Sequence, residues 1–413
     1  MTRNESQGSR ERPEMKHEPT PATQGSQASN DYVIRVVEDP AAIDAEQWNA
    51  LLDSQPAATP FMRHEYLLAL HRSGSASSEA GWLAQFITVT QGDALAAACP
   101  LYLKSHSYGE YVFDWAWADA YQRHGLPYYP KLLSAVPFTP VPGPRLLARD
   151  EDGRRLLLRA MQQLAADRKL SSAHVLFLDD ADQQAAQAEG WMMRSTVQFH
   201  WTQREPAPYT DFENFLASLQ REKRKKIQQE RRRVADAGVD FIELEGHAIT
   251  LLDWDFFYRC YQQTYLEHRS TPYLTGDFFE RMASTIPSNW LMFVATQNGA
   301  RIAASLVGID PVSRVAFGRY WGAVAHVPCL HFEACYYRPL AWCIANGYQR
   351  FEGGAQGEHK MARGLLPVQT WSAHWLAHPQ FAQAVADFLE REGAGVANYI
   401  DELNERRPFK AVD

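Results

Sequence analysis

The sequence has 413 residues, of which 46% are hydrophobic and 22% charged. This balance is typical of a globular chain with sizeable cores in two or three domains, and it excludes a disordered, fibrous or disulfide-stapled protein. The net charge is -8, from 41 Lys and Arg against 49 Asp and Glu, so any contact with nucleic acid or an acidic membrane must be local.

The start of the chain, its apolar runs and its cysteines together indicate where the protein is located. No apolar run is long enough to cross a membrane, and the start, MTRNESQGSR, lacks the apolar core of a secretory signal. The five cysteines form an odd set without a C-x-x-C pair, which favours reduced packing thiols over a disulfide or zinc framework. We therefore expect a cytoplasmic protein.

The first half of the chain shows clear patterns after a polar leader. Residues 1 to about 30 have almost no large apolar side chain and are expected to be disordered. Beyond them we predict a strand at YVIRVV, helices over 45–52 and 64–71, a long strand WLAQFITVT, a turn at Gly92-Asp93 and a second strand AAACPLYL. A strand at YVFDWAW (111–117), a helix over 154–166 and a strand HVLFLD complete this half.

The second half has a similar succession of elements. We predict a strand at VAFGRYWG (315–322), a helix over 332–345, and strands YQRFEGG and VQTWSAHWL. A closing helix begins at Pro379, because proline suits the first turn. Its expected buried stripe contains Phe381, Ala384, Val385 and Phe388.

Several segments recur at nearly one offset. WLAQFITVTQGDALAAA from Trp82 matches WLMFVATQNGARIAAS from Trp290, which is about 208 positions later, and Pro60-Phe61 with HEYLLAL matches Pro272-Tyr273 with GDFFERM. YVFDWAW roughly matches VAFGRYWG. We interpret this order as a duplication, with a leader over 1–31, a first domain over 32–203 and a second domain over 204–413.

The sequence resembles a known family at several stretches. These are GEYVFDWAWADAY, YYPKLLSAVPFTPVPGPRLL, KKIQQERRRVADAGV, HFEACYY and RFEGGAQGEHKMARGLLP. They are similar to the FemAB-like group of N-acyltransferases, related to the Fem peptidoglycan aminoacyltransferases of the GNAT superfamily. The resemblance implies an α/β (mixed α+β) fold of two tandem GNAT-like domains, each a mixed, mostly antiparallel sheet flanked by helices.

The resemblance leaves two acyl donors open. Acetyl-CoA-dependent members of the fold usually have an Arg/Gln-x-x-Gly-x-Gly/Ala turn that cradles pyrophosphate. Here the second-half loop GAVAHVPCLHFE has one glycine and no arginine, and the first-half turn that starts at Gln122 ends in Pro127. Fem enzymes also lack a clean version of this turn and take their acyl group from aminoacyl-tRNA.

A basic run lies at the entry to the second half. REKRKKIQQERRR (221–233) carries eight basic and two acidic residues. On a helix its basic side chains, including Arg224 and Lys225, lie opposite an apolar stripe of Phe212, Leu216, Leu219, Ile227 and Val234. The run is either a solvated face or, as the Fem resemblance suggests, a tRNA-binding face that contacts phosphates.

The glycine-rich stretch FEGGAQGEHKMARG (351–364) is the first candidate for chemistry, since such loops allow close backbone approach. Transfer to an amine needs a base, oxyanion donors and a slot for the donor. Glu358 or His359 suits the base, and Lys360 or Arg363 suits the oxyanion or donor; the resemblance implies a site lysine here. The alternative is a solvated surface turn.

Further candidates for substrate binding come from other segments. They are Gln356 in the same stretch, Arg319 in the predicted strand GRYWG, Glu333 at the start of the 332–345 helix with Tyr337 on the same side, and Asp114 in the aromatic segment 108–121. The aromatic segment is either a core stripe or a substrate-lining wall. Cys335 is a weaker candidate for a nucleophile. On a helix it shares a stripe with Phe332, Tyr336 and Cys343, and we expect this stripe to be buried.

Together these patterns predict an N-acyltransferase that moves an acyl or aminoacyl group to an amine without a metal or a tightly bound cofactor. The donor is aminoacyl-tRNA or, as the first alternative, an acyl-CoA such as acetyl-CoA. The second alternative is a non-catalytic binder of RNA or of an anionic envelope precursor. The acceptor is a small-molecule or peptide amine.

Overall fold

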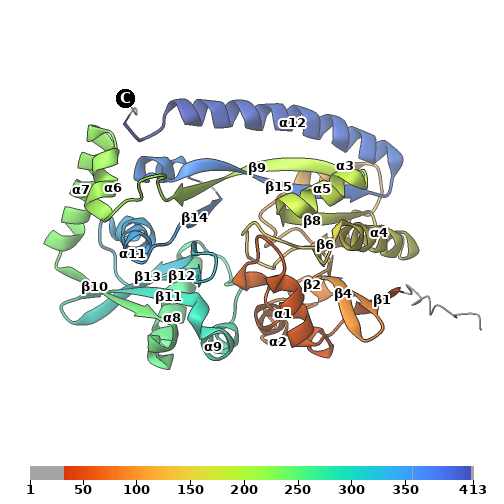
Figure 1. Ribbon diagram of the computed structural model, residues 1–413, viewed down its shortest axis with the longest axis horizontal. Helices are drawn as coiled ribbons and strands as arrows, with labels where there is room; N and C mark the ends of the chain where they lie inside the picture. Colours follow the sequence, from red (N-terminus) through yellow and green to blue (C-terminus); the bar gives the residue numbers. More distant parts are fainter. Residues whose placement is uncertain (1–31, 356, 411–413) are drawn as a thin grey trace, which may run out of the picture. The chain divides into compact units, whose positions relative to one another are not determined.

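A computed structural model describes residues 32–355 and 357–410 as alternating helices and strands (Figure 1). The expected leader and Gln356 lie outside the described residues. The first part of the chain forms β1 (Tyr32–Val37), η1 (Pro40–Ala42), α1 (Ala45–Asp53), η2 (Pro60–Met62), α2 (His64–Arg72), β2 (Trp82–Ala84), β3 (Phe86–Gln91), β4 (Ala94–Cys99), β5 (Tyr102–Lys104), α3 (Trp115–Arg123), β6 (Lys131–Ser134), β7 (Leu147–Ala148), α4 (Glu151–Asp167), β8 (Ser172–Leu178), α5 (Asp180–Ala188) and β9 (Met192–Thr202).

The second part begins with two helices and ends with the longest one. It forms α6 (Phe212–Ser218), α7 (Arg221–Asp236), β10 (Val239–Glu245), η3 (Gly246–Ala248), α8 (Leu251–Glu267), α9 (Gly276–Thr285), η4 (Pro287–Asn289), β11 (Trp290–Gln297), β12 (Ala300–Asp310), β13 (Val315–Ala323), α10 (Leu330–Phe332), η5 (Glu333–Tyr337), α11 (Arg338–Ala345), β14 (Arg350–Ala355), η6 (Glu358–Arg363), β15 (Leu366–Leu376) and α12 (Pro379–Glu405).

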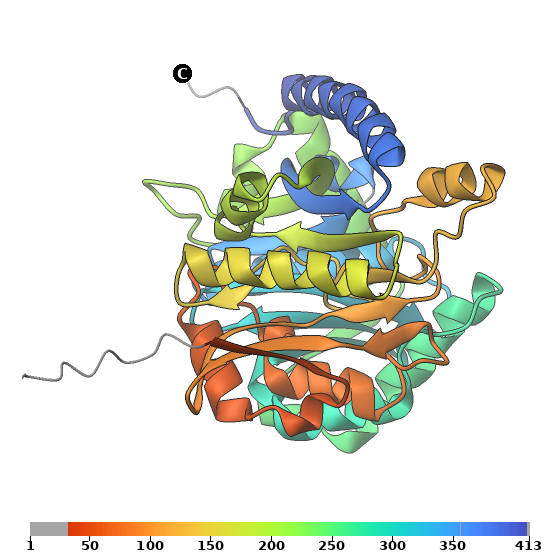
Figure 2. The same ribbon diagram turned by 90° about the vertical axis from the view of Figure 1, so that its right-hand side faces the viewer.

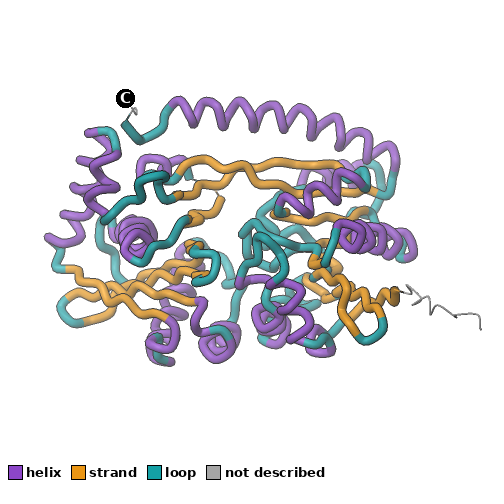
Figure 3. The backbone as a smooth tube through the Cα atoms, in the orientation of Figure 1, coloured by secondary structure: helices purple, strands orange, loops and turns teal. Residues whose placement is uncertain are grey.

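The strands form two sheets, and the larger one runs through both halves of the sequence. A four-stranded sheet has the order β1-β3-β4-β7, and an eleven-stranded sheet has the order β10-β11-β12-β13-β14-β9-β15-β8-β6-β5-β2. The helices α2, α8 and α9 lie below the strands of the large sheet in the view shared by Figures 1 and 3, and α12 crosses above β9 and β15. This mixed, mostly antiparallel architecture, with helices beside the sheets, confirms the expected fold class.

The order of the large sheet is symmetrical about its central pair, β9 and β15. Outward from β9 come β14 and β13, which are parallel, and outward from β15 come β8 and β6, which are also parallel. Each half therefore inserts its last strand into the sheet of the other half. Two copies of one module that had exchanged their final strands would produce this order; the boundary between residues 203 and 204 stays a prediction.

The two hairpins that recur in the sequence differ in one respect. The second-half hairpin is continuous, whereas the predicted strand WLAQFITVT is split at Gln85 into β2 and β3, which belong to different sheets. The facing strand is split at Pro100 and Leu101. Pro100 has no N–H to donate, so it interrupts the ladder at this point. The single long strand that we predicted is therefore wrong.

Aromatic side chains from both halves meet in one core. Tyr66 on α2 and Phe278 on α9 make an edge contact with ring centroids 5.4 Å apart, and Phe61 and Phe317 make another at 5.1 Å. These residues are at most 2% exposed. The recurring Pro-aromatic helices thus pack against each other and join the two modules.

The predicted strand over 111–117 is wrong, since Trp115 begins the helix α3. Trp117 and Tyr121 are buried four residues apart, which is a helical spacing, and Ala118 and Ala120 between them favour a helix. Figure 2 shows α3, in orange-gold, projecting from the sheets. Its buried side pairs with Val385 and Leu389 of α12 in a small apolar cluster.

The stripe predicted for α12 is partly wrong. Val385 is buried and Phe381 is half-buried, but Ala384 and Phe388 are exposed, and the other buried positions are Leu389 and Leu403. The helix touches the sheet along a narrower line than we expected. Within the described residues, no helix has both the length and the hydrophobicity that crossing a bilayer requires.

Candidate active site

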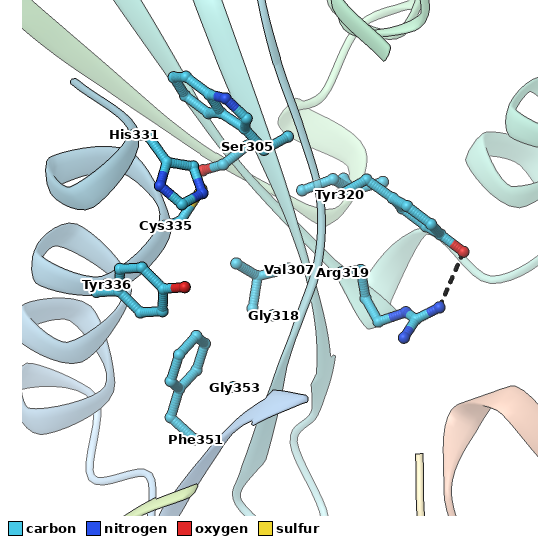
Figure 4. Close-up of a pocket in the computed structure, with 12 residues that line it drawn as sticks. Ser305, Val307, Gly318, Arg319, Tyr320, His331, Cys335, Tyr336, Phe351 and Gly353 are labelled. Carbon is cyan, nitrogen blue, oxygen red and sulfur yellow. Dashed lines mark hydrogen bonds between the residues drawn. The ribbon is translucent and has the colours of Figure 1, made fainter. Parts of the chain in front are cut away.

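The site begins where two parallel strands of the second module separate. β13 and β14 pair at Val315–Arg350, Ala316–Phe351 and Phe317–Glu352, and no pairing follows beyond these residues in the described chain. β13 stays with β12, whereas β14 continues beside β9. The gap holds a cavity of about 130 Å³ whose walls include Gly318, Phe351, Gly353, His331, Cys335 and Tyr336 (Figure 4).

The corresponding gap of the first module is closed. β6 and β8 also run parallel for three pairs, from Leu132–Ala173 to Ser134–Val175. The chain after β6 then turns back into the gap, where Gly143 N–H donates to the carbonyl of Phe177 at 3.0 Å and Gly143 bridges to Leu178. Residues 135–139 are buried there.

A β-bulge in β13 turns two side chains to one side. Leu306 pairs with Tyr320 and Val307 pairs with Gly318, so Arg319 is the extra residue. A bulge of this kind changes the direction of neighbouring side chains. Figure 4 shows Arg319 and Tyr320 on the side of β13 opposite Tyr336 and His331.

The helix beside the cavity contains a π turn. The N–H of Arg338 donates to the carbonyl of Glu333, five residues earlier, over the segment η5. Pro339 follows, and since it has no N–H it cannot restore the α-helical bond to Cys335. The wider turn places Cys335 and Tyr336 on the cavity wall, while Glu333 and Tyr337 do not line this cavity.

Two histidines beside the cavity are neutral near pH 7. Burial, together with the nearby His359 and Arg363, lowers the pKa of His331 to about 4. Burial also lowers the pKa of His359, and Arg363 and Lys360 add to this effect. The Nε2 atom of His359 lies 3.3 Å from the hydroxyl oxygen of Tyr336. A neutral imidazole can accept a proton, as a general base must.

Lys360 supports the end of β14. Its Nζ atom donates to the carbonyl of Gly353 at 2.7 Å and to that of Gly354 at 3.3 Å. Burial lowers the pKa of this amine from 10.5 to about 8. Because Gly353 also lines the cavity, Lys360 places a positive charge just behind the cavity wall.

Arg363 joins the glycine loop to the basic helix. Its Nη2 atom donates to both carboxylate oxygens of Glu230 on α7, at 2.9 and 3.1 Å, and both side chains are buried. The hydroxyl of Tyr337 donates to the same carboxylate. The guanidinium also lies 3.6 Å above the ring centre of Phe332. Arg363 therefore positions the loop, and its Nε–H is left without a hydrogen-bond partner among the described residues.

The basic run forms α7 after a break at Leu219 and Gln220, so it is not one helix with Phe212. The five residues of the predicted apolar stripe are all buried, as we expected. Arg224 is half-buried and Lys225 is exposed. Arg231 is paired with Glu333 at 3.2 Å, and Arg338 also binds Glu333 at 2.9 Å. Glu333 therefore forms ion pairs with two arginines and does not line the cavity.

The remaining candidates lie elsewhere. Glu358 is exposed and accepts a hydrogen bond from the hydroxyl of Tyr399 at 2.9 Å. Asp114 is buried in the first module, where it accepts from Lys131 and from Tyr128. Burial alone would raise the pKa of Asp114, but Lys131 holds it well below the usual value. Gln356 is outside the described residues.

Of these predicted residues, Arg319 lines the cavity, whereas His359 and Lys360 contact Tyr336 and Gly353 in its wall. The cavity also has residues that we had not chosen. These are His331, Tyr320 and Tyr336. Two features of the sequence could have indicated them. Pro339 disturbs the helix that carries Tyr336, and the two adjacent large polar residues in GRYWG fit a bulge better than a regular strand.

Comparisons with known proteins agree with this fold. The FemAB-like family model, described as peptidoglycan biosynthesis/recognition, matches residues 39–411. No curated protein matches the sequence. The structure of FemX has a TM-score of 0.51 at 10% identity over 83% of this chain and 98% of that chain, and L-PGS from Bacillus licheniformis has 0.51 at 11% over 85% and 98%. A tandem GNAT protein from the clavulanic acid biosynthesis pathway has 0.43 at 14% over 84% and 99%.

Proposed function

Because the chain belongs to the FemAB-like family, we propose that it is an N-acyltransferase that moves an acyl or aminoacyl group from aminoacyl-tRNA to an amine. The observation that carries the proposal is the cavity between the diverging strands β13 and β14, beside a neutral imidazole and a tyrosine hydroxyl. Direct attack of an amine on an ester needs these groups and no metal.

His359, Tyr336 and Lys360 have different roles in the proposed reaction. The His359 imidazole takes the proton that the attacking amine must lose, directly or through the Tyr336 hydroxyl at 3.3 Å. The tetrahedral intermediate carries negative charge on the former carbonyl oxygen, which the Tyr336 hydroxyl and the charge of Lys360 stabilise. The intermediate then collapses to the amide as the ester C–O bond breaks, and the ribose oxygen of the donor leaves as a hydroxyl with the proton that His359 had taken.

Single-turnover kinetics with an aminoacyl-tRNA and a panel of amines test the roles of these residues. We expect His359→Gln and Tyr336→Phe each to slow the transfer about 100-fold or more, while binding of the donor is retained. His247→Gln is the matched control, since His247 is exposed on η3. Unchanged rates in both site variants would contradict the assignment.

The exposed charges of α7 provide a separate test of the donor. If Arg221, Lys225 and Arg232 contact phosphates, replacing them with Gln weakens tRNA binding and lowers the salt dependence of log Kd by about 0.7–0.9 per lost contact. All three are exposed, whereas Arg231 is paired with Glu333 and is left unchanged. The same triple change leaves binding of a small acyl donor unaltered. A flat salt response in the wild type would exclude tRNA phosphates as a major contact.

An acyl-CoA donor is the second candidate, favoured by one observation. A cavity of about 520 Å³ shares Trp321 and His331 with the first and extends along residues 323–332, where the helix begins after Cys329. Backbone N–H groups at a helix start suit a phosphate. Calorimetric titration with CoA thioesters and with aminoacyl-tRNA separates the donors: tight CoA binding without tRNA binding would overturn our first choice.

A non-catalytic binder is tested in cells. We expect a variant with alanine at Glu358, His359, Lys360 and Arg363 to fail to rescue a deletion strain. Full rescue would favour a binder that uses α7 to dock RNA or an anionic envelope precursor.

A further inference from the structure

Arg319 lies at the junction of the two modules. Its Nη2 atom donates to the carbonyl of Phe138 and to the hydroxyl of Tyr320, both at 3.0 Å. The guanidinium also lies 5.3 Å from the ring centre of Phe61 and 4.9 Å from that of Tyr320. Phe61 and Phe138 come from the first module, so residues of both modules hold this cation in place.

The cation lacks an anionic partner. Within the described part of the chain, no Asp or Glu forms an ion pair with Arg319, and its buried Nε–H has no hydrogen-bond partner. The Nε–H groups of Arg363 and Arg154 also lack a hydrogen-bond partner, but these two arginines form ion pairs with Glu230 and Asp182. A guanidinium stays charged at every relevant pH, and a buried donor without a partner requires an explanation.

The surroundings are aromatic and partly open. Tyr273 stacks on Phe138 with centroids 4.8 Å apart, and Tyr265 contacts Tyr273 at 5.9 Å. Tyr265, Tyr273 and Tyr320 are half-buried. Phenol groups supply neutral hydrogen bonds and ring faces. The buried carboxylate of Glu352 interacts with Arg319 at longer range but forms its ion pair with Arg350, at 3.0 Å.

We infer that Arg319 binds a carboxylate or phosphate group of the acceptor, with the tyrosine rings against the rest of that molecule. This inference rests on the proposed transfer reaction. The acceptor approaches from the side of β13 that carries Arg319 and Tyr320, and the reacting end of the donor occupies the side that carries Tyr336 and His331 (Figure 4). The guanidinium fork matches such an anion, because it offers several N–H groups in one plane.

Anion binding is tested without turnover. The full chain, with isotope-labelled arginine, is titrated with inorganic phosphate and separately with acetate at constant ionic strength, and the Arg319 Nε–H signal is followed by NMR. We assign this signal by its absence in Arg319→Lys. We expect a saturable shift of this signal with at least one anion and none of the Arg281 signal, since Arg281 is half-buried on α9 and paired with Asp277. No saturable shift with either anion would overturn the inference.

Comparing phosphate with acetate shows which anionic group the acceptor carries. Saturation by phosphate alone indicates a phosphate-bearing acceptor, and saturation by acetate alone indicates a carboxylate-bearing one. A matched kinetic comparison uses phosphoethanolamine against ethanolamine and glycine against glycinamide. We expect Arg319→Gln to raise KM at least tenfold for the charged member of the preferred pair, to leave the uncharged member unchanged, and Arg281→Gln to change neither.

The outcomes separate this inference from the proposed function. Transfer with an unaltered preference in Arg319→Gln would overturn the anion site and leave the transferase standing. Anion binding that Arg319→Lys weakens at least tenfold, in a chain that transfers nothing, would support the site and contradict the transferase. Circular dichroism and thermal melts confirm that each variant compared is folded.

Discussion

Lys360 is the clearest case in which burial changes the chemistry of one residue. In water its amine would bind a proton until about pH 10.5, and in the folded chain it does so only until about pH 8. Below pH 8 both the folded and the unfolded chain hold the proton, and the folded chain bears the full cost of burying the charge. Between pH 8 and 10.5 the unfolded chain binds more protons, so this residue makes stability rise with pH.

A Lys360→Met variant exposes this effect. We expect the unfolding free energy of the wild type to increase relative to that of the variant by up to about 3 kcal/mol between pH 7.5 and 10.5. Urea unfolding at several pH values measures both free energies. Subtracting the value of the variant from that of the wild type removes the contribution of the other titrating groups. A difference that is constant with pH would show that the pKa of Lys360 is ordinary.

The pair of Arg363 and Glu230 gives a second test at this scale. Removing one partner leaves a buried charge alone, which costs about 3–5 kcal/mol, whereas removing both costs less than the sum. We therefore expect Arg363→Met and Glu230→Gln to be strongly destabilising alone and to be non-additive together. Additive losses in urea unfolding would show that the two residues act independently.

Individual residues were the hardest part of the site to predict. The stretch 351–364 was chosen for its glycines and charges, and from it His359 and Lys360 contact two residues of the cavity wall, Tyr336 and Gly353. The sequence does not reveal that Arg363 is held by Glu230, because that contact joins residues 133 positions apart. Asp114 and Lys131 illustrate the same difficulty, since a buried ion pair and a substrate-binding carboxylate look alike in a sequence.

At the scale of elements, one glycine sets the distance between α8 and β13. A Cβ atom on Gly322 would lie 1.9 Å from the carbonyl oxygen of Cys260 in α8. We expect Gly322→Ala to destabilise the fold by about 2–3 kcal/mol through overpacking, and to displace β13 beside the cavity.

The matched control is Gly395→Ala on α12, where nothing lies within 4 Å of the added Cβ. We expect this change to stabilise the chain by up to about 1 kcal/mol, because alanine is the better helix former. Thermal melts measure both variants. Equal effects of the two changes would show that the α8–β13 contact tolerates a methyl group.

Regular elements were predictable where one pattern dominated. The helices at 45–52 and 64–71 and the turn at Gly92 follow from local spacing, and the structure confirms them. The predicted strand at 111–117 failed, because alternating aromatic residues satisfy strand and helix patterns equally over so short a segment. The split at Pro100 was visible in the sequence as a proline within a strand, and we did not use it.

At the scale of the molecule, the exchange of β9 and β15 joins the two modules. Each central strand pairs with strands of the other half, and no repeat retains its complete sheet alone. The repeat was readable from the sequence, because the order of apolar segments recurs at nearly one offset, and its origin by duplication stays a prediction. The exchange was not readable, because a strand carries the same local pattern whichever neighbour it has.

This topology predicts one cooperative unfolding transition for the described chain. Calorimetry should give a calorimetric enthalpy close to the van't Hoff enthalpy. Residues 32–203 expressed alone should lack a cooperative melt, since β9 would lose both of its neighbours. Two resolved transitions, or a fragment that melts cooperatively, would contradict the prediction.

The closed gap between β6 and β8 has a consequence for stoichiometry. Since Gly143 lies against β8 in the first module, at the place that remains open between β13 and β14 in the second, the repeat in the chain does not predict two equivalent ligand sites. A titration with an unreactive donor analogue should therefore reach its end point at one equivalent per polypeptide.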